Sequence, residues 1–182
     1  MNRPFTMKPA LLVIDVQGQP LSELLPGRRL EFLNTIASLL KGARERGIPV
    51  VYVRHQDEWM RPGTDDWQIA DEIAPREGES IVEKRYRDAF RKTDLDDVLK
   101  RLGVDRVMVC GMQTEFCVDA TMREAERRGY RVDLVGDAHA TSPGGGLTEE
   151  QIRTHMHRVA EGAVARIVTA ADAFADVVAT AP

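Results

Sequence analysis

The fold class follows from residues 107–135, which read VMVCGMQTEFCVDATMREAERRGYRVDLV. The stretch opens with a short apolar run at 107–110 and closes with another at 132–135. Both runs are nearly continuous in apolar character, which is typical of strands buried on both faces of a parallel sheet. Between them, residues 115–128 have helical periodicity and end before Gly129, a residue type that favours helix termination. The stretch therefore predicts two parallel strands joined by a helix.

The same alternation extends to both sides of this stretch. Further strand-like runs lie at residues 10–16, 50–54 and 167–169, with a weak sixth run at 80–82. Helices are expected at 30–40 and 98–102, and an apolar helix at 170–179. This order of elements predicts an α/β fold, a three-layer doubly wound parallel sheet with helices on both faces. We expect residues 1–182 to form a single domain, because no linker or repeat interrupts the pattern.

Composition excludes several classes of protein. Of the 182 residues, 43% are hydrophobic and 30% are charged, as in a globular domain and unlike a disordered chain. Lys and Arg total 25 against 29 Asp and Glu, so no nucleic acid partner is expected. No apolar run approaches the roughly 20 residues that span a bilayer, and the polar residues 1–9 lack the features of a signal peptide. We therefore expect a cytoplasmic protein without a membrane partner, whose Cys110 and Cys117 are free thiols.

Reactive side chains follow four of the predicted strands. In a doubly wound sheet the functional site lies beyond the carboxyl ends of the strands. The residues found there are Asp15, Gln17, His55, Asp57, Lys84 and the segment 111–117. We therefore expect these side chains, which are far apart in the sequence, to meet in one site.

Cys117 is the strongest candidate for a nucleophile. Thr114 is a favourable N-cap residue and Glu115 suits a first turn, so Cys117 is expected in the opening turn of the helix. The positive end of the helix dipole lowers the pKa of a thiol at such a position. The alternative is that Cys117 packs beneath the helix. Cys110 lies inside a strand and is expected to be an inert core residue.

Two charged residues complete the candidate site. Asp15 ends an apolar strand, where a buried carboxylate needs a cationic partner; a loop-capping role is the alternative. Lys84 lies in a charge-rich stretch and gains meaning only if it is close to Asp15 and Cys117. A lysine in that position could stabilise a thiolate or exchange protons with it.

The sequence lacks the common motifs for metals and nucleotides. No Cys-x-x-Cys, His-Glu-x-x-His or strand-end His-x-His cluster is present, so no cofactor and no metal is expected. His155 and His157 lie two apart on a predicted helix, which favours a surface role. His55 and His139 follow strands, where each could contact a substrate or have a structural role. The glycines match neither a dinucleotide-binding loop nor a Walker A loop.

Three groups of residues occur in a characteristic order. They are Leu-Val-Ile-Asp15-Val-Gln17; Val82-Glu83-Lys84 with Asp88-Ala89-Phe90 and Thr93-Asp94-Leu95; and Gly111-Met112-Gln113-Thr114-Glu115-Phe116-Cys117-Val118 with Thr121. Together they resemble the isochorismatase-like cysteine hydrolase family, which includes nicotinamidases and N-carbamoylsarcosine amidohydrolases. Val135-Gly136-Asp137-Ala138 and Pro62-Gly63 with Trp67 also fit, so that the resemblance covers about residues 8–175.

The resemblance implies a six-stranded parallel sheet and a catalytic triad that hydrolyses C–N bonds of small molecules. By motif position the triad is Asp15, Lys84 and Cys117. The family also implies an oxyanion hole formed by the backbone N–H groups of Gln113 and Cys117, after a cis peptide bond between Met112 and Gln113. Family members that cleave the vinyl ether of isochorismate lack the cysteine, so its presence favours amide hydrolysis.

One departure from the family concerns metal. The nicotinamidase branch holds a metal through an Asp-x-His motif and a further histidine, whereas this chain has His55-Gln56-Asp57-Glu58 and no second histidine nearby. The expected function is therefore metal-independent hydrolysis of a carboxamide or ureide through a thioester acyl-enzyme. The residues expected to bind the small-molecule substrate are Gln17, His55, Trp67, Phe90 and Phe116, with core packing as the alternative for the aromatic ones.

Two other functions fit parts of the pattern. A phosphatase of the haloacid dehalogenase type also has an Asp after the first strand, a later Lys and a Gly-Asp pair, but it requires Asp-x-Asp, and Gln17 occupies the second position. A non-catalytic protein that binds a small molecule or a partner on the same fold is the other alternative. Relatives of this fold associate, so we expect a homodimer or a higher even-numbered homo-oligomer, with residues 170–179 in the interface.

Overall fold

The computed structural model describes residues 7–177, which build one six-stranded parallel sheet. Its strands are β1 (Pro9–Ile14), β2 (Val50–His55), β3 (Ser80–Lys84), β4 (Arg106–Met112), β5 (Arg131–Ala140) and β6 (Arg166–Val168). They lie in the order β3-β2-β1-β4-β5-β6, so the chain winds outward in opposite directions from the central β1–β4 pair. The predicted fold class is confirmed, and the weak run at 80–82 belongs to a full strand.

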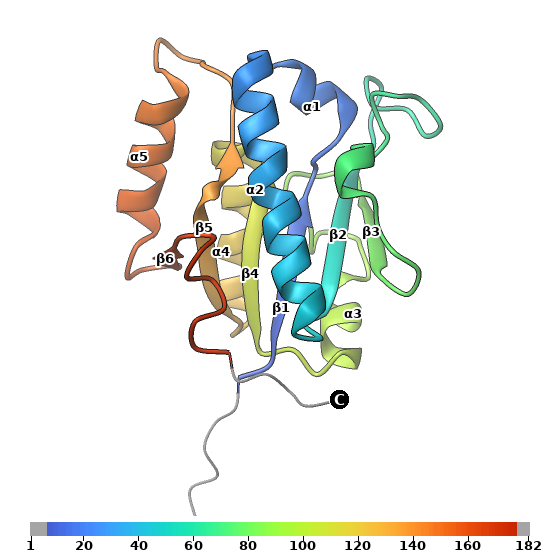
Figure 1. Cartoon of the computed structure of the whole chain (residues 1–182), viewed down its shortest axis with the longest axis vertical. Helices are drawn as coiled ribbons and strands as arrows, with labels where there is room; N and C mark the ends of the chain where they lie inside the picture. Colours follow the sequence, from blue (N-terminus) through green and yellow to red (C-terminus); the bar gives the residue numbers. More distant parts are fainter. Residues whose placement is uncertain (1–6, 178–182) are drawn as a thin grey trace, which may run out of the picture.

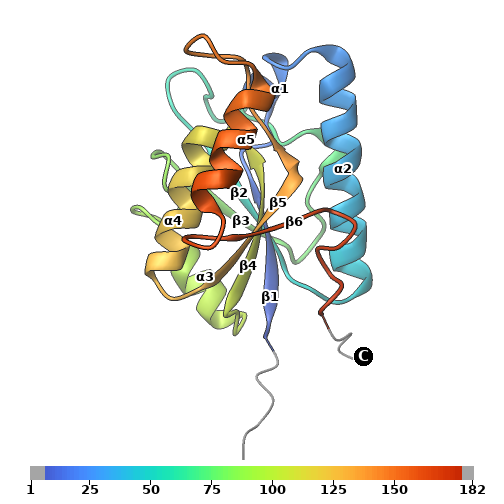
Figure 2. The same ribbon diagram turned by 90° about the vertical axis from the view of Figure 1, so that its left-hand side faces the viewer.

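Helices cover both faces of the sheet. The long α2 (Pro26–Glu45) lies on one face with the short η1 (Asp71–Ile73), while α3 (Leu95–Arg101), α4 (Asp119–Arg127) and α5 (Glu149–Ala160) lie on the other (Figures 1 and 2). The alternation of β1 side chains divides the core, since Leu11 and Val13 pack toward α2 whereas Leu12 and Ile14 pack toward α3 and α4. The short α1 (Gly18–Ser22) follows the carboxyl end of β1.

The carboxyl ends of the two central strands depart from regular geometry. β1 ends earlier than predicted because Asp15 has a φ of +49°, a left-handed conformation that Asp tolerates better than most residues. In β4, Gly111 has a φ of +120°, and a Cβ there would overlap the carbonyl oxygen of Ile14. The two strands therefore pass at very short range immediately before Asp15 and the loop that follows β4.

The prediction of a helix at 170–179 is wrong for its described part. Residues 170–177 form successive turns, and residues 178 and 179 lie outside the described range. Thr169 and Asp172 hydrogen-bond each other and the local backbone, which competes with helix formation. The Phe174 ring packs on α2 at Gly42, where a Cβ would leave it no room. Tertiary contacts thus shape this segment more than its apolar composition does.

No helix between residues 7 and 177 has both the length and the apolar character needed to cross a bilayer. The expectation that residues 1–182 form a single domain stays a prediction.

Candidate active site

The structure brings Asp15, Lys84 and Cys117 together at the carboxyl edge of the sheet. Asp15 follows β1, Lys84 ends β3, and Cys117 lies in a single π-helical turn, η2 (Thr114–Val118), between β4 and α4. The Lys84 Nζ is 2.6 Å from Oδ2 of Asp15 and donates a hydrogen bond to Sγ of Cys117 at 3.3 Å. We refer to these three residues as the triad.

Lys84 uses all three of its N–H donors. The third goes to Nδ1 of His55 at a distance of 2.9 Å. Burial alone lowers the pKa of Lys84, but the Asp15 carboxylate and the Cys117 sulfur outweigh it, so the pKa lies above its ordinary value. The side chain is therefore a buried ammonium ion at neutral pH.

The hydrogen bond from Lys84 fixes the tautomer of His55. An ammonium group has no acceptor, so Nδ1 of His55 must accept and the ring proton must reside on Nε2. That nitrogen lies 3.3 Å from Oδ2 of Asp57. Burial, followed by the charge of Lys84, lowers the pKa of His55, which keeps the ring neutral. Both ring nitrogens of His55 therefore face protein groups, and the expected substrate contact of His55 stays a prediction.

Asp15 retains one unused acceptor. Its side chain is buried, and Oδ1 has no hydrogen-bond partner among the described residues, although Oδ2 is paired with Lys84. The same carboxylate acts on Cys117, since it raises the pKa of the thiol. A buried carboxylate that shares the Lys84 ammonium with a thiol and keeps an acceptor free within residues 7–177 is suited to accept the thiol proton.

The expectation of a lowered pKa at Cys117 is wrong. Burial, and then the Asp15 carboxylate, raise the pKa of the thiol to about 12, although Lys84 opposes the shift. Cys117 does lie in the opening turn, but its environment holds it as a neutral thiol at rest. The predicted N-cap also differs, because Thr114 makes no capping hydrogen bond and its hydroxyl is instead 2.8 Å from Nδ1 of His139.

The loop between β4 and η2 has the predicted cis peptide bond between Met112 and Gln113. The carbonyl oxygen of Gln113 accepts hydrogen bonds from the N–H groups of Phe116 and Val118, which close the π-helical turn. The side chain of Gln113 donates to Glu23 at 2.6 Å and to Ser142 at 3.3 Å. Gln113 is thereby tied both to its own turn and to two neighbouring loops.

Gln17 and Trp67 make contacts within the protein, and their expected substrate contacts stay predictions. The Gln17 amide is fully buried, donates to the carbonyl oxygens of His55 and Trp67, and accepts from the N–H of His55. The Trp67 ring lies 3.5 Å from the guanidinium of Arg54. Because side chains alternate along β2, Arg54 and this ring lie on the sheet face opposite to His55.

The two phenylalanines expected near substrate differ in position. Phe90 is a core residue, with its ring 6.1 Å from that of Tyr130, which precedes β5 at the amino edge of the sheet. Phe116 directly precedes Cys117 and is only partly buried, so it stays a candidate for substrate contact. The guanidinium of Arg87 lies 4.2 Å from the Phe116 ring. Arg87 was not identified in the sequence, because nothing distinguishes it from the other charges of the stretch after Lys84.

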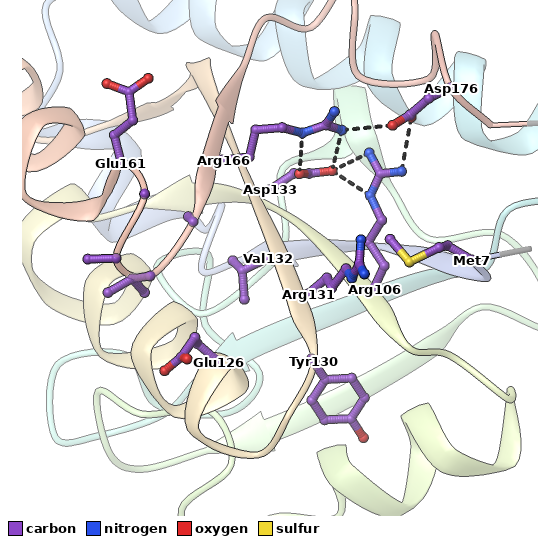
Figure 3. A pocket seen from close by; sticks show the side chains of 14 residues that line it. Met7, Arg106, Glu126, Tyr130, Arg131, Val132, Asp133, Glu161, Arg166 and Asp176 are labelled. Atoms are coloured by element: carbon purple, nitrogen blue, oxygen red, sulfur yellow. Dashed lines mark hydrogen bonds and ion pairs between the residues drawn. The ribbon is translucent and has the colours of Figure 1, made fainter. Parts of the chain in front are cut away.

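The described residues contain no metal-binding group, and the cavity shown in Figure 3 lies away from the triad. Within residues 7–177, no three His, Cys, Asp or Glu side chains gather as a metal-binding group. A cavity of 540 Å³ lies at the amino edge of the sheet, where Arg106, Asp133, Arg166 and Asp176 form a network of ion pairs (Figure 3). None of the triad residues lines that cavity.

The chain is similar to known proteins over most of its length. Residues 9–178 match the model of the isochorismatase domain. An isochorismatase family protein of Bacillus subtilis is 35% identical over 147 residues, which cover 75% of this chain and 79% of that protein. Maleamate amidohydrolase of Pseudomonas putida is 32% identical over 161 residues, covering 75% and 76% of the two chains. The crystal structure of an isochorismatase from Pseudomonas putida superposes with a TM-score of 0.83 at 31% identity, over 94% of this chain and 93% of that one.

Proposed function

The chain belongs to the isochorismatase family of hydrolases, and on that premise we propose that it hydrolyses a C–N bond of a small carboxamide or ureide with Cys117 as nucleophile. The observation that carries the proposal is the buried Lys84 ammonium, which hydrogen-bonds Asp15 and Cys117 at once. The amide class is supported by similarity to a maleamate amidohydrolase. The family match disfavours the haloacid dehalogenase alternative.

The first half of the reaction forms a thioester. Oδ1 of Asp15, which is buried and has no hydrogen-bond partner within residues 7–177, takes the proton of the Cys117 thiol, and Lys84 stabilises the resulting thiolate. The sulfur attacks the carbonyl carbon, and the backbone N–H groups of Gln113 and Cys117 stabilise the oxyanion. As the C–N bond breaks, the leaving nitrogen takes the proton from Asp15, so that ammonia or an amine departs.

The second half regenerates the thiol. Asp15 takes a proton from a water molecule, whose oxygen attacks the thioester carbonyl. The C–S bond breaks, the carboxylic acid is released, and Cys117 recovers the proton from Asp15. Because the pKa of Cys117 is raised, the thiol is neutral before the reaction, and the sulfur attacks only after its proton has passed to Asp15. No step uses a metal ion, in keeping with the engaged ring nitrogens of His55.

Ammonia release from a panel of small amides and ureides tests this proposal. We expect Cys117→Ala to abolish turnover and leave the fold intact. Cys110→Ala is the matched control, since Cys110 is fully buried in β4; it should retain turnover and lower stability by about 1 kcal/mol. Treatment with a chelator should leave activity unchanged. A wild-type chain that binds amides without releasing ammonia would support the non-catalytic alternative, and recovery of a chelated enzyme by zinc would contradict the metal-free mechanism.

We also propose that the enzyme acts in the cytoplasm as a homodimer or a higher even-numbered homo-oligomer. The helical interface expected at 170–179 has lost its basis, because residues 170–177 pack on α2 as turns. Light scattering at micromolar concentration measures the mass, and a monomer of 20.3 kDa would refute self-association.

A further inference from the structure

We infer that His139 is a positioning residue that holds the nucleophile turn in place through Thr114, with His157 fixing the histidine in turn. The inference rests on the proposed role of Cys117. We refer to Thr114, His139 and His157 as the histidine chain. Its members come from three different elements, namely η2, β5 and α5.

The histidine chain is continuous at hydrogen-bond distance. Oγ1 of Thr114 lies 2.8 Å from Nδ1 of His139, and Nε2 of His139 lies 2.8 Å from Nε2 of His157. The two rings meet edge to face, with centroids 5.0 Å apart. Both nitrogens of His139 are therefore engaged, one toward the nucleophile turn and one toward α5.

The site is shaped to hold this arrangement. Thr114 and His139 are 1% and 0% exposed, so each polar group depends on the other for its hydrogen bond. Gly136 of β5 leaves room for the His157 ring, since a Cβ there would lie 3.1 Å from Cε1 of that ring. Loss of either bond would leave a buried polar atom unpaired, which is costly.

The charges around the histidine chain favour neutral rings. Burial, followed by His157, Arg153 and Arg28, lowers the pKa of His139 well below its ordinary value. The pKa of His157 is lowered by burial and Arg153, against an opposing effect of Glu161. Between two neutral rings one nitrogen donates and the other accepts, so the bond persists at neutral pH.

Thr114 transmits this restraint to the catalytic groups. It stands between Gln113 and Cys117, which carry the proposed oxyanion donors and the nucleophile. The whole turn has five residues, and the carbonyl oxygen of Thr114 accepts the N–H of Asp119 at its far end. A rotation of Thr114 would therefore shift the Cys117 sulfur relative to Lys84, and small displacements of reacting groups reduce rates strongly.

Two matched pairs of variants separate positioning from packing. Thr114→Val removes the hydroxyl at nearly constant volume, whereas Thr114→Ser keeps it. In His139→Gln the amide can replace Nε2 and so reach His157 but not Thr114. In His139→Asn the amide can replace Nδ1 and so keep the bond to Thr114.

We expect Thr114→Val and His139→Gln to lower kcat about 10-fold or more with KM changed less than twofold. Thr114→Ser and His139→Asn should stay within about threefold of the wild-type kcat. If the role were merely structural, all four variants would lose thermal stability, and kcat would not differ between Val and Ser at 114 or between Gln and Asn at 139. Equal kcat for Val and Ser at 114 would overturn the inference, and if Thr114→Val does not fold, equal kcat for Gln and Asn at 139 would do so.

A second measurement needs no substrate and separates this inference from the proposed function. The rate of iodoacetamide alkylation at Cys117, followed by mass spectrometry, should fall in Thr114→Val and His139→Gln and not in their partners. If the wild-type chain releases no ammonia from any amide but the alkylation rates follow this pattern, the proposed function fails and the positioning role stands. If ammonia is released and the alkylation rates do not differ, the positioning role fails alone.

Discussion

Two groups of paired charges lie at opposite ends of the same sheet. At the amino edge, Arg106 and Arg166 each pair with both Asp133 and Asp176 in a closed network (Figure 3). At the carboxyl edge, Lys84 pairs with one oxygen of Asp15, and the other oxygen has no partner among the described residues.

The difference lies in how many opposite charges each group meets. In the network at the amino edge, every charged group meets an opposite charge, and Asp176 ties the last described turns to the sheet. In the triad, the cation divides its donors among a carboxylate, a ring nitrogen and a thiol. A closed set of ion pairs holds a structure, whereas an open set next to a thiol can move a proton.

The largest effect is expected when the triad loses its cation. Lys84→Met should lower kcat/KM by about 10³-fold or more, because residues that act as a unit fail together. Lys100→Met is the matched control, since Lys100 is exposed and, within residues 7–177, pairs only with Asp96 on its own helix. Steady-state kinetics on folded protein, verified by circular dichroism, checks the result; full activity of Lys84→Met would remove the basis of the mechanism.

A substitution at the amino edge should lower stability and leave kcat unchanged. Arg106→Met leaves the buried Asp133 with Arg166 as a remaining cation, so the loss of stability should stay below the cost of a completely broken buried pair, which is about 3–5 kcal/mol. Urea denaturation should show this loss, while the protein that stays folded keeps its kcat. A fall in kcat with unchanged stability would show that the two groups of charges are not separate in function.

A change of pH should distinguish the two edges more subtly. Burial lowers the pKa values of His55, His139 and His157. His55 and His139 lie near the carboxyl ends of β2 and β5, and His157 contacts His139. Between pH 7 and 5 the unfolded chain binds protons that the folded chain excludes, so the free energy of unfolding falls as the pH falls, by up to about 1.4 kcal/mol per pH unit for the buried His139 and by less for the more exposed His55 and His157. At the amino edge, hydrogen bonds to Asp133 raise the pKa of Arg166, and although burial opposes them, the two arginines lower the pKa of Asp176, so neither of these groups titrates in this range.

Denaturation curves at pH 7 and pH 5 measure this slope, and His139→Asn should reduce it because one titrating ring is removed. Equal stability at the two pH values would mean that the histidines are protonated in the folded state.

Local patterns predicted the sheet well because each strand is a short run of apolar residues. The six strands and their order of elements follow from runs such as 107–110 and 132–135, whose burial on both faces needs no knowledge of partners. For residues 170–177 the local pattern predicted a helix, whereas the structure has turns. The path of this segment depends on Phe174 reaching Gly42 and on Asp176 reaching Arg106, and such distant partners leave no periodic signal.

The sequence predicted which residues meet in the candidate site better than it predicted their pKa values. Motif order identified the three residues that the fold brings together. The pKa of Cys117 was predicted in the wrong direction because the helix dipole is a local property, whereas burial and the Asp15 carboxylate come from tertiary packing. The bond between Thr114 and His139 escaped prediction for the same reason, since 25 residues separate the two side chains.

The π-helical turn η2 also fixes how many residues the chain can have between β4 and α4. The bonds from Val118 to Gln113 and from Asp119 to Thr114 each span five residues, one more than in an α-helix. Removal of one residue between 114 and 118 would convert the turn to α-helical spacing and rotate the start of α4 by about 100°. Thr121, Met122 and Ala125 would then turn away from the sheet that buries them. In this stretch a deletion should therefore disturb the packing of α4 more than a side-chain substitution does. The number of residues between the nucleophile and the buried face of α4 is a structural requirement of the fold.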